Sequence, residues 1–98
     1  MPRLDRNGYR TSLFDTEDGR CYVCKTYRET ARHEVLFGPN RQLSKRYGLW
    51  INVCPGCHDR VHKASNEDYL YLKEKAQRLF EKEYPDDSFL AIFGRNYI

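Results

Sequence analysis

The sequence has no apolar run that approaches the length of a membrane span, and its first twenty residues contain no apolar stretch suited to a signal peptide. Internal repeats and low-complexity tracts are also absent, and no linker is long enough to divide the 98 residues. We therefore expect one domain, residues 1–98, in the cytoplasm and away from membranes. Thiols remain reduced there, so cysteine pairs indicate a metal or redox site in preference to a disulfide.

Cysteine is scarce but ordered, because the four cysteines form two short pairs, Cys21-x-x-Cys24 and Cys54-x-x-Cys57. Four thiolates in two such pairs suit the tetrahedral coordination of a structural zinc ion. A thioredoxin-like redox site would need only one pair, at a strand-to-helix turn. A chain this small buries too little apolar surface to be comfortably stable without a staple, and zinc would supply one.

The charge of the chain is unevenly distributed. Residues 1–64 hold 12 lysines and arginines against 7 acidic residues, whereas residues 65–98 hold 5 against 7. The cysteine-bearing part is therefore the part that could face a polyanion such as DNA. Many small soluble domains carry a similar excess, so the charge alone does not separate these two interpretations.

Residues 1–20 lack periodicity and predict an N-terminal arm, either laid along DNA through its arginines or disordered. Ala31 to Phe37 alternates with a strand-like composition. The alternation places His33 on one face of this strand, and Arg32 and Glu34 on the other.

Turn residues end that strand at Gly38-Pro39-Asn40, and Gln42 to Tyr47 predicts a short helical turn. Leu49 to Val53 is rich in bulky side chains and predicts a second strand that runs into the second cysteine pair. A helix is expected from His58 onward, which would place His58 and His62 on one face because they are four residues apart.

Two helices are expected in the remaining chain. Ser65-Asn66-Glu67-Asp68 resembles a helix start, and apolar residues recur at helical spacing from Tyr69 until Pro85. A shorter helix is predicted from Ser88 to Phe93, ending at Gly94. We expect the apolar side of the long helix to pack on the zinc-bearing part.

The residues Cys21-x-x-Cys24, Arg32-His33-Glu34 and Cys54-x-x-Cys57-His58-x-x-x-His62 resemble the zinc-bracketed motif of the HNH nucleases. Most of the chain also looks like small prophage proteins grouped with the recombination-enhancement, RecA-dependent nucleases. The resemblance implies an α+β domain, with a ββα-metal core over residues 21–64 after the arm at 1–20 and a C-terminal helical cover over residues 65–98. It also implies a metal-dependent DNA endonuclease or nickase of phage or prophage origin, acting in the bacterial or phage-infected host cytoplasm on DNA that a RecA filament could hold.

The resemblance also assigns roles to the histidines. His33 matches the general base that activates water, and His58 matches a ligand of a catalytic Mg²⁺ or Mn²⁺ ion. His62 matches a position that supports the metal or the phosphate. Histidine suits proton transfer near neutral pH, and a divalent cation stabilises charge at the phosphate.

Two positions depart from the family motif. Arg32 stands where many HNH proteins have a ligand for the catalytic metal, so another oxygen must take that place; Glu34 is the nearest carboxylate and Asp59 the next. Leu49 stands where the middle asparagine is expected, and Asn40, or less plausibly Asn52, could supply its hydrogen bonds.

Several basic residues could contact DNA phosphates, although each could equally lie on a solvated surface. These residues are Arg32, Arg41, Lys45, Arg46, Arg60 and Lys63. Other interpretations also remain: His33 could be an ordinary strand histidine, and a histidine could replace one cysteine in a Cys₃His zinc site. The alternative function is a non-catalytic, zinc-ribbon-like module that binds DNA or protein. Oligomeric state and the preferred DNA sequence are not indicated.

Overall fold

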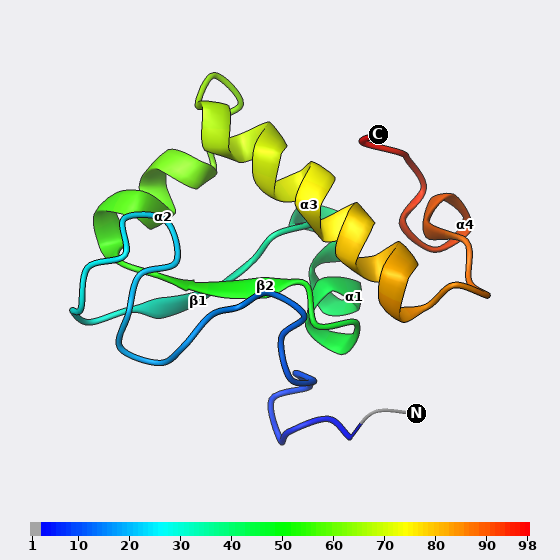
Figure 1. Cartoon of the computed structure of the whole chain (residues 1–98), viewed down its shortest axis with the longest axis horizontal. Helices are drawn as coiled ribbons and strands as arrows, with labels where there is room; N and C mark the ends of the chain where they lie inside the picture. Colours follow the sequence, from blue (N-terminus) through cyan, green and yellow to red (C-terminus); the bar gives the residue numbers. More distant parts are fainter. Residues whose placement is uncertain (1–2) are drawn as a thin grey trace.

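The computed structural model describes residues 3–98, and the first two residues of the predicted arm lie outside the described residues. Within that range the chain is a small α+β structure with a two-stranded sheet and four α-helices (Figure 1). The elements follow in the order β1 (Ala31–Glu34), the 3₁₀ turn η1 (Gly38–Asn40), α1 (Arg41–Arg46), β2 (Trp50–Val53), α2 (Pro55–Val61), α3 (Glu67–Glu83) and α4 (Phe89–Phe93). No helix in residues 3–98 combines the length and apolar character needed to cross a membrane.

The two strands are antiparallel, with His33 opposite Ile51 and Glu34 opposite Trp50. β1 is shorter than the predicted strand, which extended to Phe37. It ends early because Leu36 hydrogen-bonds with the Ser44 side chain of α1, which accepts from the Leu36 N–H at 3.0 Å and donates to its carbonyl at 2.7 Å. The predicted helical turn is present as α1, and its Ser44 side chain makes the hydrogen bonds that a strand partner would otherwise make with Leu36.

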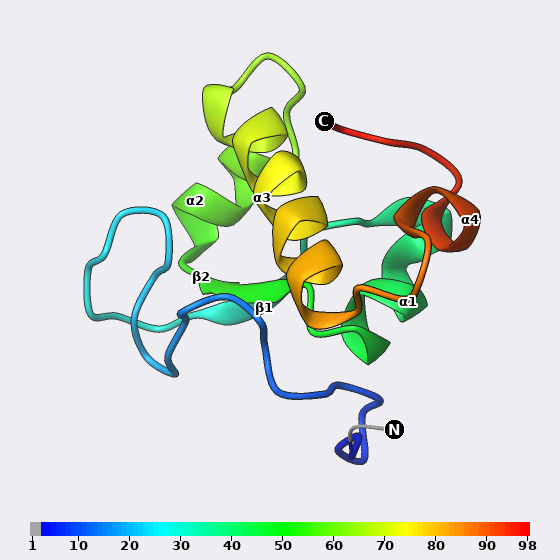
Figure 2. The same ribbon diagram turned by 45° about the vertical axis from the view of Figure 1, so that its right-hand side comes forward.

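All four residues of β2 are buried, so both faces of the sheet are covered. The helices cover one face, and α3 crosses it diagonally, while the chain before residue 20 runs along the opposite side (Figures 1 and 2). A two-stranded sheet is at best marginally stable by itself, so it depends on the helices packed on one face and the arm packed on the other.

The arm is packed on the sheet, which corrects the expectation of a disordered or DNA-extended segment. Trp50 donates its indole N–H to the Arg10 carbonyl at 2.8 Å, and Phe14 is buried in the core. The arm passes so close to Gly48 that a Cβ there would lie 2.7 Å from the Thr11 carbonyl oxygen. Sequence patterns could not predict this contact, because it is made by backbone atoms and single side chains without a repeating pattern.

The two C-terminal helices begin and end close to the predicted residues. Asn66 caps α3, its side-chain oxygen accepting from the Asp68 N–H at 2.8 Å. Ser88 caps α4 in the same way, and Gly94 ends it in a left-handed conformation with φ of 83°. The core-facing side of α3 includes Leu72, Ala76 and Phe80, as the apolar spacing predicted.

Two polar residues, Lys73 and Gln77, are also buried on α3, and the apolar spacing did not predict them. The Lys73 ammonium donates to the Val35 carbonyl at 2.9 Å and lies 4.0 Å from the centre of the Phe37 ring. Gln77 accepts from the Tyr97 N–H at 2.6 Å. These bonds compensate the burial of polar groups and attach α3 to β1 and to the C-terminal segment.

Phe80 is fully buried between aromatic rings, with ring centres 5.4 Å from Tyr47 and 5.5 Å from Phe89. Phe80→Ala should lower the free energy of unfolding by about 3–5 kcal/mol, because it removes a buried ring and leaves a cavity. Urea denaturation measures this loss. Arg78→Ala on the exposed side of the same helix is the control, with an expected change of about 0.5 kcal/mol or less; equal losses would contradict the described core.

Burial, with a smaller effect of Arg95, lowers the pKa of Lys73 to about 8. Between pH 8 and the ordinary lysine pKa of about 10.4, the unfolded chain therefore holds a proton at this site that the folded chain has released. The contribution of Lys73 to the unfolding free energy should therefore rise with pH across this window, by up to about 3 kcal/mol. Denaturation at several pH values measures this contribution as the difference between the wild type and Lys73→Met, which should grow with pH, whereas the difference between the wild type and the exposed control Lys82→Met should stay constant.

Candidate metal centres

The first candidate metal centre is the set of four cysteines, whose sulfur atoms all lie within 4.8 Å of one another. Cys24 Sγ and Cys54 Sγ are 3.9 Å apart. Two thiolates bound tetrahedrally to one zinc ion at 2.3 Å would be separated by about 3.8 Å. The cage formed by Cys21, Cys24, Cys54 and Cys57 is therefore compatible with a structural zinc ion.

The local backbone explains how each cysteine pair reaches the cage. Lys25 takes a left-handed conformation with φ of 64°, and its N–H donates to the Cys21 carbonyl at 2.9 Å, so the chain turns directly after the first pair. The second pair lies at the start of α2, which begins at Pro55 and so earlier than the predicted start at His58. Proline suits the first turn of a helix because its missing N–H would have no partner there.

The thiols of Cys24 and Cys57 differ in acidity before a metal binds. Burial raises the pKa of Cys57 to about 12, whereas hydrogen bonds from Thr26 lower the pKa of Cys24 to about 6. Arg60 donates to Cys57 Sγ at 2.8 Å and so stabilises negative charge on the cage. A buried thiol of this kind becomes a thiolate only when a cation compensates its charge, so zinc binding should release protons.

Cys57→Ala should lose zinc and the cooperative thermal transition together, because zinc binding and folding are coupled. Metal analysis and circular dichroism measure the two effects on the same sample. Tyr27→Ala is the control, since Tyr27 is exposed on the loop between Cys24 and β1. A folded Cys57→Ala protein without metal would show that the cage is not the staple.

The second candidate centre contains all three histidines of the chain, His33, His58 and His62. One nitrogen of each ring lies within 4.8 Å of the others, and the two Nε2 atoms of His58 and His62 are 3.1 Å apart. His33 comes from β1, His58 from the first turns of α2, and His62 directly follows that helix. The sheet and α2 thus bring together residues that are about thirty positions apart in sequence.

The three imidazoles form a gradient of exposure, from His33, which is buried, through half-buried His58 to exposed His62. Burial lowers the pKa of His33 to about 3, and the charges of His62, His58 and Lys73 act in the same direction. Burial also lowers the pKa of His62. His33 is therefore neutral at pH 7, and its ring has a nitrogen lone pair for a proton or a metal ion.

A cavity of about 260 Å³ surrounds the histidines, and Glu34 and Tyr9 contribute to its wall. The Glu34 carboxylate accepts hydrogen bonds from the Tyr9 hydroxyl at 2.8 Å and from Arg41. Glu34 is thus close to the centre but is not a member of the three-histidine group. Asp59, the other predicted carboxylate, forms an ion pair with Lys63 and is outside the group as well.

Neither predicted substitute for the missing asparagine lines the histidine cavity. Asn40 donates its side-chain N–H to the Phe93 carbonyl at 3.0 Å, which joins η1 to the end of α4. Asn52 donates to Asp18 at 3.3 Å and so fastens the arm to β2. A role for Asn40 in catalysis stays a prediction.

Most residues predicted to contact DNA already have protein partners. Arg32 pairs with Asp5 at 3.0 Å, while Arg41, Arg60 and Lys63 contact Glu34, Cys57 and Asp59 respectively. Lys45 and Arg46 have no ion-pair partner within residues 3–98. Exposed ion pairs are weak, so pairing alone does not prevent a phosphate from recruiting these side chains.

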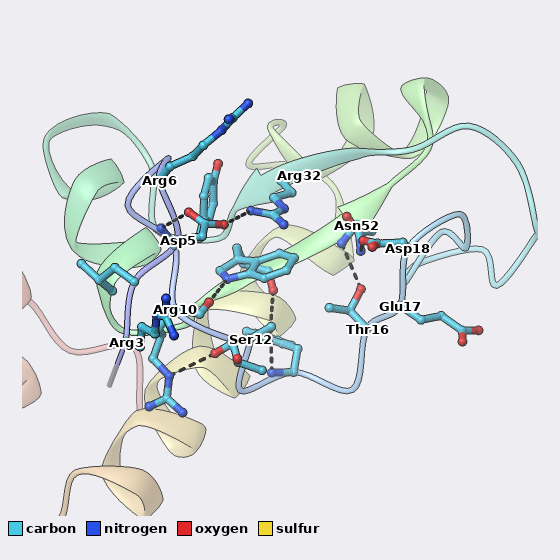
Figure 3. Close-up of a pocket in the computed structure, with 15 residues that line it drawn as sticks. Arg3, Asp5, Arg6, Arg10, Ser12, Thr16, Glu17, Asp18, Arg32 and Asn52 are labelled. Carbon is cyan, nitrogen blue, oxygen red and sulfur yellow. Dashed lines mark hydrogen bonds and ion pairs between the residues drawn. The ribbon is translucent and has the colours of Figure 1, made fainter. Parts of the chain in front are cut away.

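A second, larger cavity of about 750 Å³ lies between the arm and the sheet, and four of its lining residues are arginines (Figure 3). Arg32 lies 4.5 Å from the centres of both the Tyr9 and Trp50 rings, which pack edge-to-face on each other at 5.5 Å, so its guanidinium contacts both rings. Arg3 and Arg6 have no ion-pair partner within the described chain. Tyr9 and Arg32 also line the histidine cavity, so the two cavities are neighbours.

Sequence reasoning missed Tyr9 and Lys73 as neighbours of the histidines, and it assigned Arg60 to DNA instead of the cage. Tyr9 lies in a segment without periodicity, so no pattern marked it. Arg60 carried a usable signal, because its position three residues after Cys57 on a helix places both side chains on one face. No family model, curated protein or solved structure matches the chain. The assignment of the two centres therefore depends on their geometry alone.

Proposed function

We propose that this protein is a metal-dependent, HNH-type DNA endonuclease or nickase that hydrolyses phosphodiester bonds. The observation that carries the proposal is the three-histidine group on a cavity beside, and separate from, the cysteine cage. A structural zinc site needs no further ligands, whereas three imidazoles on an open cavity can hold a second cation at which water and phosphate meet.

The order of elements supports the same proposal. β1, β2 and α2 follow one another as they do in a ββα-metal core, with one histidine on the first strand and the next in the helix. In the roles that the resemblance implies, His33 accepts the proton of the attacking water and His58, supported by His62, holds Mg²⁺ or Mn²⁺. Glu34 would contribute an oxygen through a bound water, since its carboxylate lies on the same cavity.

DNA is the proposed substrate because basic side chains lie at the cavity next to the histidines and on α1. Arg3 and Arg6 lie at the arm cavity, and Lys45 and Arg46 lie on α1. Arginine and lysine contacts to phosphate set the register of a strand without reading its bases. The proposed setting is DNA in phage or prophage recombination, with a RecA filament as the partner that could present it.

A plasmid nicking assay tests the function. Wild-type protein with added Mg²⁺, Mn²⁺ or Zn²⁺, with and without RecA, should convert supercoiled plasmid to the nicked or linear form. His33→Ala and His58→Ala should each lower the rate at least 100-fold, because each removes an imidazole from the centre, while the rate of the exposed α4 variant Leu90→Ala should stay within twofold.

The alternative function is a non-catalytic zinc-ribbon-like module that binds DNA or protein. The observation that favours it is Arg32, which stands in the position of a metal ligand but packs against Tyr9 and Trp50 outside the histidine group. A folded protein with one zinc ion per chain that cuts no DNA under any of these conditions would support this alternative and contradict the nuclease.

A further inference from the structure

We propose that His33, His58 and His62 are the three protein ligands of one metal ion, and that the site selects Zn²⁺ or a similar late transition metal over Mg²⁺. His33 is then a ligand and not the residue that takes the proton from water. The inference replaces two roles given under the proposed function, that of His33 as the base and that of Mg²⁺ or Mn²⁺ as the ion. It rests on the proposed function only for the reaction that the ion supports, since the binding of the ion can be measured without DNA.

The spacing of the ring nitrogens is the first reason. Two imidazole nitrogens bound tetrahedrally to one zinc ion at 2.0–2.1 Å would be separated by about 3.3 Å. The Nε2 atoms of His58 and His62 are 3.1 Å apart, and the His33 nitrogen lies within 4.8 Å of both. The rings of His33 and His62 have centres 4.8 Å apart and are almost perpendicular, at 83°, so the two rings do not stack on each other.

The backbone holds these three side chains in place before any ion binds. His58 and His62 are four residues apart at α2, a spacing that directs two imidazoles to one side and recurs in helical zinc sites. His33 is held in the strand register opposite Ile51, which is fully buried. A site built on a helix and a strand loses little conformational entropy when an ion binds.

The donor atoms are the second reason. Mg²⁺ prefers oxygen ligands and retains several waters, whereas imidazole suits zinc, copper, iron and nickel. The compact group contains three nitrogens and no carboxylate oxygen. The carboxylate that lines the cavity, Glu34, is not a member of this group and already accepts from Tyr9 and Arg41.

The histidine site is also separate from the cysteine cage. The cage uses all four thiols of the chain, so its zinc needs no histidine. Three protein ligands leave one position of a tetrahedral ion open, which is typical of catalytic and not structural zinc sites. The cavity of about 260 Å³ beside the three rings provides room for water or a phosphate oxygen at that position.

Zinc titration of the full chain tests the inference, starting from protein whose cage already holds one zinc ion. The wild type should bind a second Zn²⁺ per chain, measured by calorimetry and metal analysis, and a tenfold excess of Mg²⁺ should not displace it. His62→Ala and His33→Asn should each weaken this second binding at least tenfold. Asp59→Asn, which removes a charge from the exposed side of α2 outside the three-histidine group, should leave it within twofold.

Folding is monitored separately through the cage zinc and the melting temperature. His62 is exposed, so His62→Ala should fold even if His33→Asn does not, and it then decides the outcome alone. A wild type that binds only one zinc ion, or a second site kept at full affinity in His62→Ala, would overturn the inference.

The nicking assay separates this inference from the proposed function. Binding of a second zinc ion without cleavage of DNA would contradict the proposed nuclease function but support the three-histidine zinc site. Cleavage that depends on Mg²⁺ and Glu34, with unchanged zinc binding in the histidine variants, would support the nuclease and contradict the ligand role of His33.

Discussion

Convergence of the four cysteine sulfurs is the constraint on which the rest of the structure depends. The two cysteine pairs are about thirty residues apart, and closing so long a loop costs conformational entropy that a two-stranded sheet cannot recover alone. The Sγ atoms of Cys24 and Cys54 are 3.9 Å apart, which places the end of β2 and the start of α2 beside the first cysteine pair. Because His58 follows Cys57 directly, closing the cage also places the imidazoles.

Both faces of the hairpin then need a cover, and two different kinds of segment provide it. α3 contributes an apolar surface that includes Phe80, together with a buried ammonium, Lys73, bonded to the Val35 carbonyl. The arm contributes backbone hydrogen bonds and Phe14 instead of a regular element. The arm also carries Tyr9 to Glu34, so a segment distant in sequence forms part of the histidine cavity.

The features that sequence patterns predicted are those with a local physical cause. Asn66 and Ser88 cap helices through bonds two or three residues away, and the cysteine pairs follow zinc-ligand spacing. Patterns failed where the cause is a distant partner. The packing of the arm on Gly48, and the burial of Lys73 toward Val35, depend on atoms more than thirty residues away that no periodicity reveals.

The histidines lie between these two cases. The i, i+4 spacing predicted that His58 and His62 share a face, but the distances to His33 follow from the register of β1 with β2. The division between base and ligand was taken from the family resemblance and is not encoded in spacing. Three nitrogens within 4.8 Å make all three histidines geometrically similar, so spacing does not divide them into a base and ligands.

Cys57 and His58 are adjacent in one turn of α2, so the geometry of the histidine centre depends on the cysteine cage. Removing an ion from the imidazoles would leave the thiolate scaffold unchanged, because no histidine belongs to it. Oxidising or stripping the thiolates would free the start of α2 and separate the imidazoles at the same time. Metal binding at the histidines should therefore depend on an intact cysteine cage, whereas the cage does not depend on the histidines.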